Sequence, residues 1–253
     1  MSMHFSLIRP HPQHEREAAY ERARGAYEDH QWLWHRFFPA SRGTPRDFLF
    51  RRLHAGAAAC FHVVSARAPC QDVPGWQVQT KHYEPRLNDG ERLRFELRAN
   101  PVVSRPGEPL LDAGELPRQR TTGMRVGTAK HKVVRHDVVM DAKKRLLGER
   151  GIGRWGDWRD QDKPLLYELA REACSQWLIK QGRKRGFEVN PDELHVDAYT
   201  QHRGKDGRLR FSSVDFAGEL TVVDAASLVD ALMRGIGPAK AFGCGLLLVR
   251  RVG

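Results

Sequence analysis

The sequence lacks the features of several large protein classes. None of its apolar runs approaches the roughly 20 residues that a membrane-spanning helix needs, which excludes a transmembrane protein. Its first residues have no apolar signal-peptide core. The cysteines, at positions 60, 70, 174 and 244, form no Cys-x-x-Cys pair, so neither a zinc site nor a disulfide scaffold is indicated. We therefore expect a reduced, cytoplasmic protein with no metal and no cofactor.

Motifs of the common nucleotide-binding and metal-dependent enzymes are also missing. The chain has no Gly-Lys-Ser/Thr phosphate loop, and its glycine-rich stretch precedes an apolar run, whereas a dinucleotide fingerprint opens a helix. It has no His-Glu-x-x-His and no aspartate cluster with metal-ligand spacing. An RNA-recognition strand motif with paired aromatics is not evident. A metal-dependent nuclease stays open as an alternative, although the sequence offers no ligands for it.

What the chain has in excess is positive charge. Its 253 residues include 42 lysines and arginines against 31 aspartates and glutamates, a formal net charge of +11. This excess predicts a polyanionic partner, of which nucleic acid is the commonest. Basic residues gather in residues 118–135, 143–145 and 202–210. Each group alone is typical of a solvated face, but the three together favour nucleic acid.

Hydrophobic periodicity predicts two similar α+β units. In the first we expect a helix that starts at Ala26 and stops before Pro39, and strands at 3–8, 48–53, 59–66, 76–83 and 92–98. In the second we expect a helix at 165–182, a helix at 225–233, and strands at 194–201, 208–216, 218–223 and 246–249. The order predicts two tandem ferredoxin-like (RRM-like) βαββαβ domains, at residues 1–100 and 131–253. Residues 101–130, marked by prolines and glycines, are expected to be a linker or insertion.

The glycine-rich stretch joins the last expected helix to the last strand. Its glycines, at positions 235, 237, 243 and 245, allow the backbone to turn sharply and approach a ligand closely. Lys240 stands among them, and its ammonium group suits a phosphate. These features are compatible with a phosphate-binding loop. On glycine count alone, a tight turn with a solvated lysine is the favoured alternative.

Tyr27 and His30 stand three residues apart, so they share a face of the expected helix. A phenol and an imidazole can move protons without a metal, which fits cleavage of RNA by its own 2′-hydroxyl. The spacing leaves a second interpretation open, in which His30 is a structural group beside Trp34 and Phe37. It also does not tell whether His30 would act as acid or base.

Residues 202–210 are expected to form a hairpin with a basic tip. Such a hairpin can enter or straddle a nucleic-acid groove. Because no paired aromatics are evident, shape and phosphate recognition of a stem is favoured over stacking of unpaired bases. The candidate RNA-binding residues of this hairpin are His202, Arg203, Lys205, Arg208 and Arg210.

Several stretches resemble the CasE family, the CRISPR-associated endoribonucleases of the type I-E system. The N-terminal signature of that family is similar to residues 27–35 with Phe38-Pro39 and to residues 46–50. Further similarity lies in residues 93–101 (Leu-Arg-Phe-Glu-Leu-Arg-Ala-Asn-Pro) and in residues 214–220, which lead into residues 235–247. The similarity spans both halves of the chain, and the motifs follow the same order as in the family.

The resemblance implies two ferredoxin-like domains and metal-independent cleavage of CRISPR repeat RNA at the base of its stem-loop. The mature guide RNA would stay bound and join the other Cascade subunits. The family's catalytic histidine corresponds to His30, and the tyrosine used by some members corresponds to Tyr27. Its RNA-stem hairpin corresponds to residues 202–210 and its glycine-rich loop to residues 235–245, which adds Gly235, Gly237, Gly243 and Gly245 to the expected RNA-binding residues.

Two features depart from the family pattern. The segment before Tyr27 is longer, and Gln31 stands where some members carry a basic residue. Part of the positive charge that compensates the phosphate must therefore come from elsewhere, and the candidates are Arg24, Arg36 and Lys240. The expected products are a 2′,3′-cyclic phosphate and a 5′-hydroxyl. The alternative is a non-catalytic subunit that only holds the guide RNA.

Overall fold

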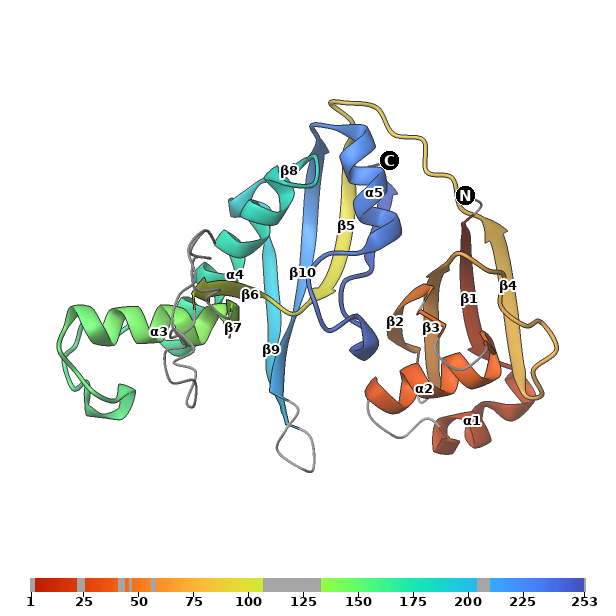
Figure 1. Ribbon diagram of the computed structural model, residues 1–253, viewed down its shortest axis with the longest axis horizontal. Helices are drawn as coiled ribbons and strands as arrows, with labels where there is room; N and C mark the ends of the chain where they lie inside the picture. The colour runs from red at the N-terminus through yellow and green to blue at the C-terminus, as the bar shows by residue number, and fades with distance from the viewer. Residues whose placement is uncertain are drawn as a thin grey trace, which may run out of the picture.

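The chain folds into two lobes, each built on an antiparallel sheet (Figure 1). The structure is a computed structural model that describes residues 3–21, 26–40, 44–45, 47–55, 58–106, 133–203 and 210–252. The first four strands and the helices between the first two of them form the first lobe, and the described elements that follow form the second (Figure 1). Among the described residues, no helix is long and apolar enough to cross a membrane.

The first lobe has a four-stranded sheet in the order β2-β3-β1-β4, with every neighbouring pair antiparallel. Its strands are β1 (His4–Pro10), β2 (Phe48–Ala55), β3 (Ala58–Ser65) and β4 (Trp76–His82). Its helical segments are η1 (Pro12–His14), α1 (Glu15–Glu21) and α2 (Ala26–Arg36). Residues 66–75, between β3 and β4, contain no helix, so this unit has helices only after its first strand.

The second lobe has a sheet in the order β11-β5-β10-β8, and β9 also pairs with β10. Its strands are β5 (Arg92–Ala99), β8 (Phe187–Val189), β9 (His195–Arg203), β10 (Arg210–Val222) and β11 (Leu247–Arg251). Its helical segments are α4 (Leu166–Arg183), η3 (Pro191–Glu193), α5 (Ala225–Arg234) and η4 (Lys240–Phe242). The long strand β10 pairs with β9 along its first part and with β8 at its end.

A smaller substructure is inserted after β5. It consists of the two-stranded sheet of β6 (Val102–Pro106) and β7 (Val133–Asp137), the helix α3 (Val138–Glu149) and the turn η2 (Trp155–Asp157). Asp137 caps α3, because its side chain accepts hydrogen bonds from the backbone N–H groups of Val139 and Met140, both 2.9 Å long. Helix α3 extends away from the first lobe (Figure 1).

The expected fold class is confirmed, with two corrections. In the first sheet β1 lies between β3 and β4, and in the second sheet β5 lies between β10 and β11, which is the arrangement of a ferredoxin-like fold. The strand at residues 92–98 does not complete the first domain as expected: β5 pairs with β10 and β11 in the second sheet. The sheets therefore divide between β4 and β5 and not at residue 100. Residues 210–222 form one continuous strand instead of two.

Local sequence explains the elements that hold the two sheets. In β5 every second residue is buried, namely Leu93, Phe95, Leu97 and Ala99. In α5 the apolar residues Leu228, Ala231 and Leu232 form one buried stripe. Asp224 begins this helix by accepting a hydrogen bond from the Ser227 backbone N–H, 3.1 Å long.

The lobes meet through a small apolar cluster and a group of charges. Leu49 and Val64 of the first lobe pack with Leu246 of the second. Beside them Arg98 donates two hydrogen bonds to Asp215, of 2.8 and 2.6 Å, while Arg51 of the first lobe lies 3.9 Å from the same carboxylate. The hydrogen bonds to Asp215 raise the pKa of Arg98, whereas burial lowers the pKa of Arg51. These contacts fix the edge of the first sheet, which carries α2, against the second.

Candidate nucleic-acid interface

The glycine-rich loop begins where α5 ends and folds back on itself before β11. Gly235 has a φ of 75°, and a Cβ added there would lie 2.9 Å from both the Gly245 carbonyl oxygen and the Leu49 side chain. The Ile236 N–H donates to the Gly245 carbonyl over 2.8 Å, which closes the loop. Any larger residue at position 235 would force the two ends apart.

Three of the four glycine N–H groups of this loop are bonded within the protein. The Gly235 N–H donates to Ala231, the Gly243 N–H to Lys240 and the Gly245 N–H to Arg98. Of the four glycines, only the Gly237 N–H makes no backbone hydrogen bond within the described residues. These three glycines therefore serve close packing of the backbone, and the expected contact of the loop with a phosphate stays a prediction.

Lys240 is bound to the loop itself. Its Nζ donates a hydrogen bond to the Arg234 carbonyl oxygen, one of the acceptors left open at the C-terminal end of α5. A cation in this position is favoured by the helix dipole. The structure thus gives Lys240 a stabilising contact within the protein, and its expected role as a phosphate ligand stays a prediction.

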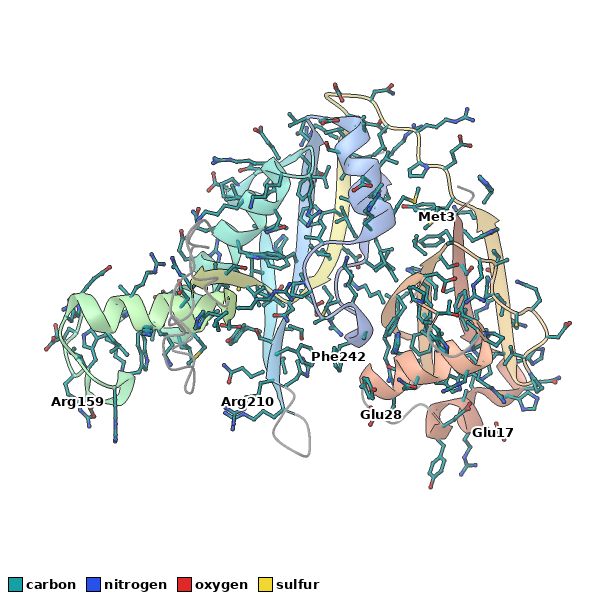
Figure 2. All side chains as sticks on the ribbon, viewed as in Figure 1. Met3, Glu17, Glu28, Arg159, Arg210 and Phe242 are labelled. Atoms are coloured by element: carbon teal, nitrogen blue, oxygen red, sulfur yellow. The ribbon has the colours of Figure 1, made fainter. Side chains whose placement is uncertain are left out.

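A row of four aromatic rings connects the two lobes. The ring of Phe242, in η4, lies 5.6 Å from the ring of Tyr27 and 4.6 Å from the ring of Phe211. Phe211 in turn stacks on His202, with centroids 4.4 Å apart and ring planes inclined by 16°. Figure 2 shows Phe242 facing the start of α2, where Glu28 is labelled. The row brings the first turn of α2, the glycine-rich loop and the base of the hairpin together.

Tyr27 and His30 point to different places. Tyr27 is 49 % exposed, and its hydroxyl accepts a 3.3 Å hydrogen bond from the Gln31 side chain. The imidazole of His30 stacks on Phe48 in the first lobe, with centroids 5.4 Å apart, and both of its ring nitrogens are shielded from solvent. A helix turns by about 100° per residue, so two side chains three residues apart point in different directions. Of the two, His30 lies nearer to the buried side of α2.

The glycine-rich loop packs near the same aromatic group. The ring of Phe50 lies 6.3 Å from the ring of His30. A Cβ added at Gly243, the residue after η4, would lie 3.3 Å from the Phe50 ring. His30 therefore lies one aromatic layer below the loop, close to the junction of the lobes although enclosed.

Asp29 is fully buried, and Arg52 of β2 donates to it over 2.9 Å. This carboxylate joins α2 to the sheet. An ion pair that links two elements in this way holds the helix in register on the sheet. Removing one partner of such a pair is costly.

The remaining expected site residues have mixed outcomes. Arg203 pairs with Arg210 in the register of β9 and β10, so both lie at the base of the hairpin with exposed side chains. His202 Nε2 lies 2.8 Å from the Ser213 hydroxyl, and burial lowers the pKa of His202, with the nearby Arg98 acting in the same direction. Arg36 is exposed in the last turn of α2, about 13 Å along the helix axis from Tyr27. Arg24, Lys205 and Arg208 lie outside the described residues.

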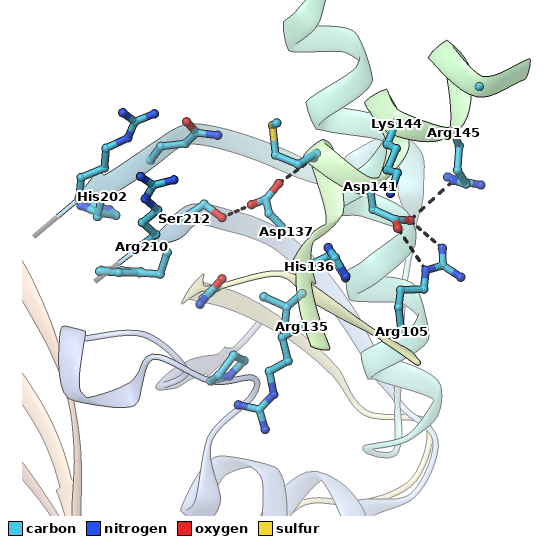
Figure 3. A pocket seen from close by; sticks show the side chains of 18 residues that line it. Arg105, Arg135, His136, Asp137, Asp141, Lys144, Arg145, His202, Arg210 and Ser212 are labelled. Carbon is cyan, nitrogen blue, oxygen red and sulfur yellow. Dashed lines mark hydrogen bonds and ion pairs between the residues drawn. The ribbon is translucent and has the colours of Figure 1, made fainter. Parts of the chain in front are cut away.

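Sequence reasoning missed a large cavity in the second lobe. It has a volume of about 1080 Å³ and lies between the inserted substructure and the strands β9 and β10 (Figure 3). Residues far apart in the chain line it, including Asn100, Arg135, Lys144 and Phe211. The signals in the sequence are the three basic groups at 118–135, 143–145 and 202–210, and Asn100 in one of the family-like motifs. None of them indicates that these residues meet.

Comparisons with known proteins agree on one family. A family model described as CRISPR associated protein matches residues 3–251. The chain is 31 % identical to the CRISPR system Cascade subunit CasE of Escherichia coli over 231 residues, which cover 89 % of this chain and 92 % of that protein. It is 29 % identical to the CRISPR-associated endoribonuclease Cse3 of Thermus thermophilus over 175 residues, which cover 67 % of this chain and 60 % of that protein.

Solved structures agree in fold. Thermus thermophilus Cse3 bound to an RNA representing a pre-cleavage complex has a TM-score of 0.61 at 24 % identity, with 99 % of this chain and 100 % of that chain covered. Escherichia coli Cas6e has a TM-score of 0.53 at 24 % identity, with 98 % and 100 % covered. The likeness extends over both lobes.

Proposed function

The chain belongs to the family of CRISPR-associated proteins, and we propose that it is an endoribonuclease that cleaves CRISPR repeat RNA at the base of its stem-loop. The mature guide RNA then stays bound, and the protein joins the other Cascade subunits with it. The observation that carries this proposal is the relation to the Cascade subunit CasE along most of both chains.

The junction of the lobes supports the same proposal. The basic base of the hairpin and the exposed phenol of Tyr27 are connected by the aromatic row through Phe211 and Phe242. A stem held at the hairpin would place the RNA strand that leaves it over this row, beside the start of α2. Aromatic rings and basic side chains together suit a strand that leaves a duplex.

The reaction uses the RNA's own 2′-hydroxyl. Its oxygen attacks the adjacent phosphorus while the bond from phosphorus to the 5′-oxygen breaks, which gives a 2′,3′-cyclic phosphate and a 5′-hydroxyl. One proton leaves the 2′-oxygen and one is delivered to the 5′-oxygen, so an acid and a base are needed. We assign proton transfer to His30 and assistance from Tyr27. The imidazole of His30 is enclosed, so the glycine-rich loop, which packs on Phe50, must shift when RNA docks. Loop motions gate other enzymes in the same way.

The same enclosure favours a second candidate function, a non-catalytic subunit that holds the guide RNA. One experiment separates the two. Purified protein is incubated with its own repeat RNA in EDTA, and the products are resolved on a gel and tested for a cyclic phosphate end. The proposal predicts cleavage at one position with that end. Tight binding of uncut RNA supports the second candidate, and cleavage that requires a divalent metal contradicts the metal-free chemistry.

A further inference from the structure

The cavity of the second lobe has the composition of a nucleotide site. Apolar surface comes from Val102, Met140, Phe211 and Pro238, and cationic side chains surround it. Its volume of about 1080 Å³ is slightly above the range in which proteins hold small ligands, about 300–1,000 Å³. A space of this size accepts a nucleotide, and a duplex would have to remain outside it.

The acidic residues of the cavity are already engaged. Asp141 accepts two hydrogen bonds from Arg105, of 3.1 and 2.7 Å, and lies 3.7 Å from Arg145. The hydrogen bonds from Arg105 lower the pKa of Asp141, so it stays ionised. Asp137 accepts from the first N–H groups of α3, from the Tyr199 hydroxyl over 3.0 Å and from Ser212 (Figure 3). Neither carboxylate has to be neutralised by a ligand.

Four further cations lie around the same space with no such partner. They are exposed and make no ion pair with any residue that the structure describes: Arg135, Lys144, Arg203 and Arg210. Figure 3 shows Lys144 on α3 and Arg210 on β10, with the cavity between these two elements. These charges, which have no ion-pair partner in the part of the chain that the structure describes, make the cavity attractive to a phosphate.

Asn100 supplies an independent indication of a ligand. It lines the cavity at 6 % exposure, and its Oδ1 is buried with no hydrogen-bond partner among the described residues. A buried polar group without a partner is unfavourable and unusual in a folded protein. A hydroxyl or amino group of a ligand would satisfy it.

The cavity also adjoins the aromatic row. Phe211 lines the cavity and contacts Phe242, and Pro238 of the glycine-rich loop lies on the cavity wall. An RNA strand that crosses the row can thus place a neighbouring nucleotide in the cavity. Unpaired RNA bases are recognised in this way, by stacking on aromatic or guanidinium planes and by hydrogen bonds to their edges.

We propose that this cavity binds one unpaired nucleotide of the single-stranded RNA next to the stem. The base of the nucleotide lies against Phe211 and Met140, and Asn100 hydrogen-bonds to its base edge or 2′-hydroxyl. Its phosphate lies among the four exposed cations around the cavity. The inference rests on the proposed function, because the ligand is RNA. It extends that function by adding an RNA contact outside the stem.

The test compares two RNAs, the repeat with its single-stranded flanks and the stem-loop alone. Asn100→Ala, and separately Arg135→Ala with Lys144→Ala, should each weaken binding of the flanked RNA by about 10-fold, as loss of one good base contact or of phosphate contacts does. Binding of the stem-loop alone should change by less than about 2-fold. For the flanked RNA, the slope of log K against log salt concentration should become shallower by about 1.4 in the double variant. Each single-strand phosphate contact contributes about 0.7 to that slope.

A matched control removes the same charge elsewhere. Lys180→Ala with Arg183→Ala takes two exposed cations from the last turn of α4, away from the cavity lining, and should leave the preference for flanked RNA unchanged. Equal weakening of both RNAs by the cavity variants would assign these residues to the stem and overturn the proposal, as would no weakening at all. Failure of the parent protein to cut either RNA would refute the nuclease and leave this binding test intact.

Discussion

The ring of Phe242 lies 5.6 Å from the ring of Tyr27, so the glycine-rich loop of the second lobe contacts the first turn of α2 in the first. On its other side Phe242 lies 4.6 Å from Phe211 of the hairpin strand β10. One side chain thus connects the helix assigned to catalysis with the strand assigned to RNA binding.

Phe242→Ala should uncouple these two elements. Each aromatic pair contributes about 0.5–1.5 kcal/mol, so losing two pairs should lower the free energy of unfolding by about 1–3 kcal/mol. The single-turnover cleavage rate should fall about 10- to 100-fold, since small misplacements of reacting groups are costly. RNA affinity should stay within about 3-fold, because the basic residues of the hairpin remain.

Two controls accompany this variant. Phe242→Tyr keeps the ring and should cleave at nearly the parent rate. Trp155→Ala removes a 5.5 Å ring contact with Trp158 beyond the end of α3, so it should leave the cleavage rate unchanged. A Phe242→Ala protein that cleaves like the parent would show that the row does not position the RNA.

Asp215 is expected to matter for the stability of the junction between the lobes. Asp215→Ala leaves Arg98 and the largely buried Arg51 close together without their shared carboxylate. We expect the free energy of unfolding, measured by urea denaturation, to fall by about 1.5–3 kcal/mol, the range for hydrogen bonds to charged groups.

Asp230→Ala is the matched control for that variant. Its carboxylate makes an exposed pair with Arg234 one turn along α5, 2.6 Å long. Such pairs contribute about 0.3–0.5 kcal/mol. Similar losses for the two variants would mean that the charges between the lobes are no more important than surface charges.

Stability should fall in mild acid because of His62. Burial lowers its pKa, with the positive charge of Arg51 acting in the same direction and Glu96 opposing it. In the unfolded chain a histidine titrates near about 6.5. As the pH falls below that value, the unfolded chain binds a proton that the folded chain does not, so stability decreases until the lowered pKa of the folded state is reached.

The measurement is the melting temperature of the parent and of His62→Gln across this pH range. The variant should lose less stability on acidification than the parent. His35→Gln, which changes an exposed histidine on α2, should behave like the parent. Identical pH profiles for parent and His62→Gln would contradict the assignment.

The sequence predicted most elements but not their partners. Alternation in residues 92–98 identified a strand, yet alternation defines a buried face and carries no information about which sheet receives it. Position in the chain suggested the first domain, and pairing with β10 and β11 placed the strand in the second. Continuous pairing through Gly218 likewise merged two expected strands into β10.

The candidate site was predictable where residues are close in sequence. The spacing of Tyr27 and His30 placed both on α2, but burial of His30 depends on Phe48 and Phe50 of β2. The cavity around Asn100 could not be found from the sequence, because the fold brings together walls from segments that lie far apart in the chain.

His30→Phe tests the central claim most directly, because phenylalanine keeps the stacking on Phe48 and removes both ring nitrogens. With repeat RNA under single-turnover conditions, we predict a cleavage rate about 100- to 10,000-fold below that of the parent, with RNA affinity and melting temperature nearly unchanged. A His30→Phe protein that cleaves as fast as the parent would contradict the account, because the imidazole would then serve only the packing of α2.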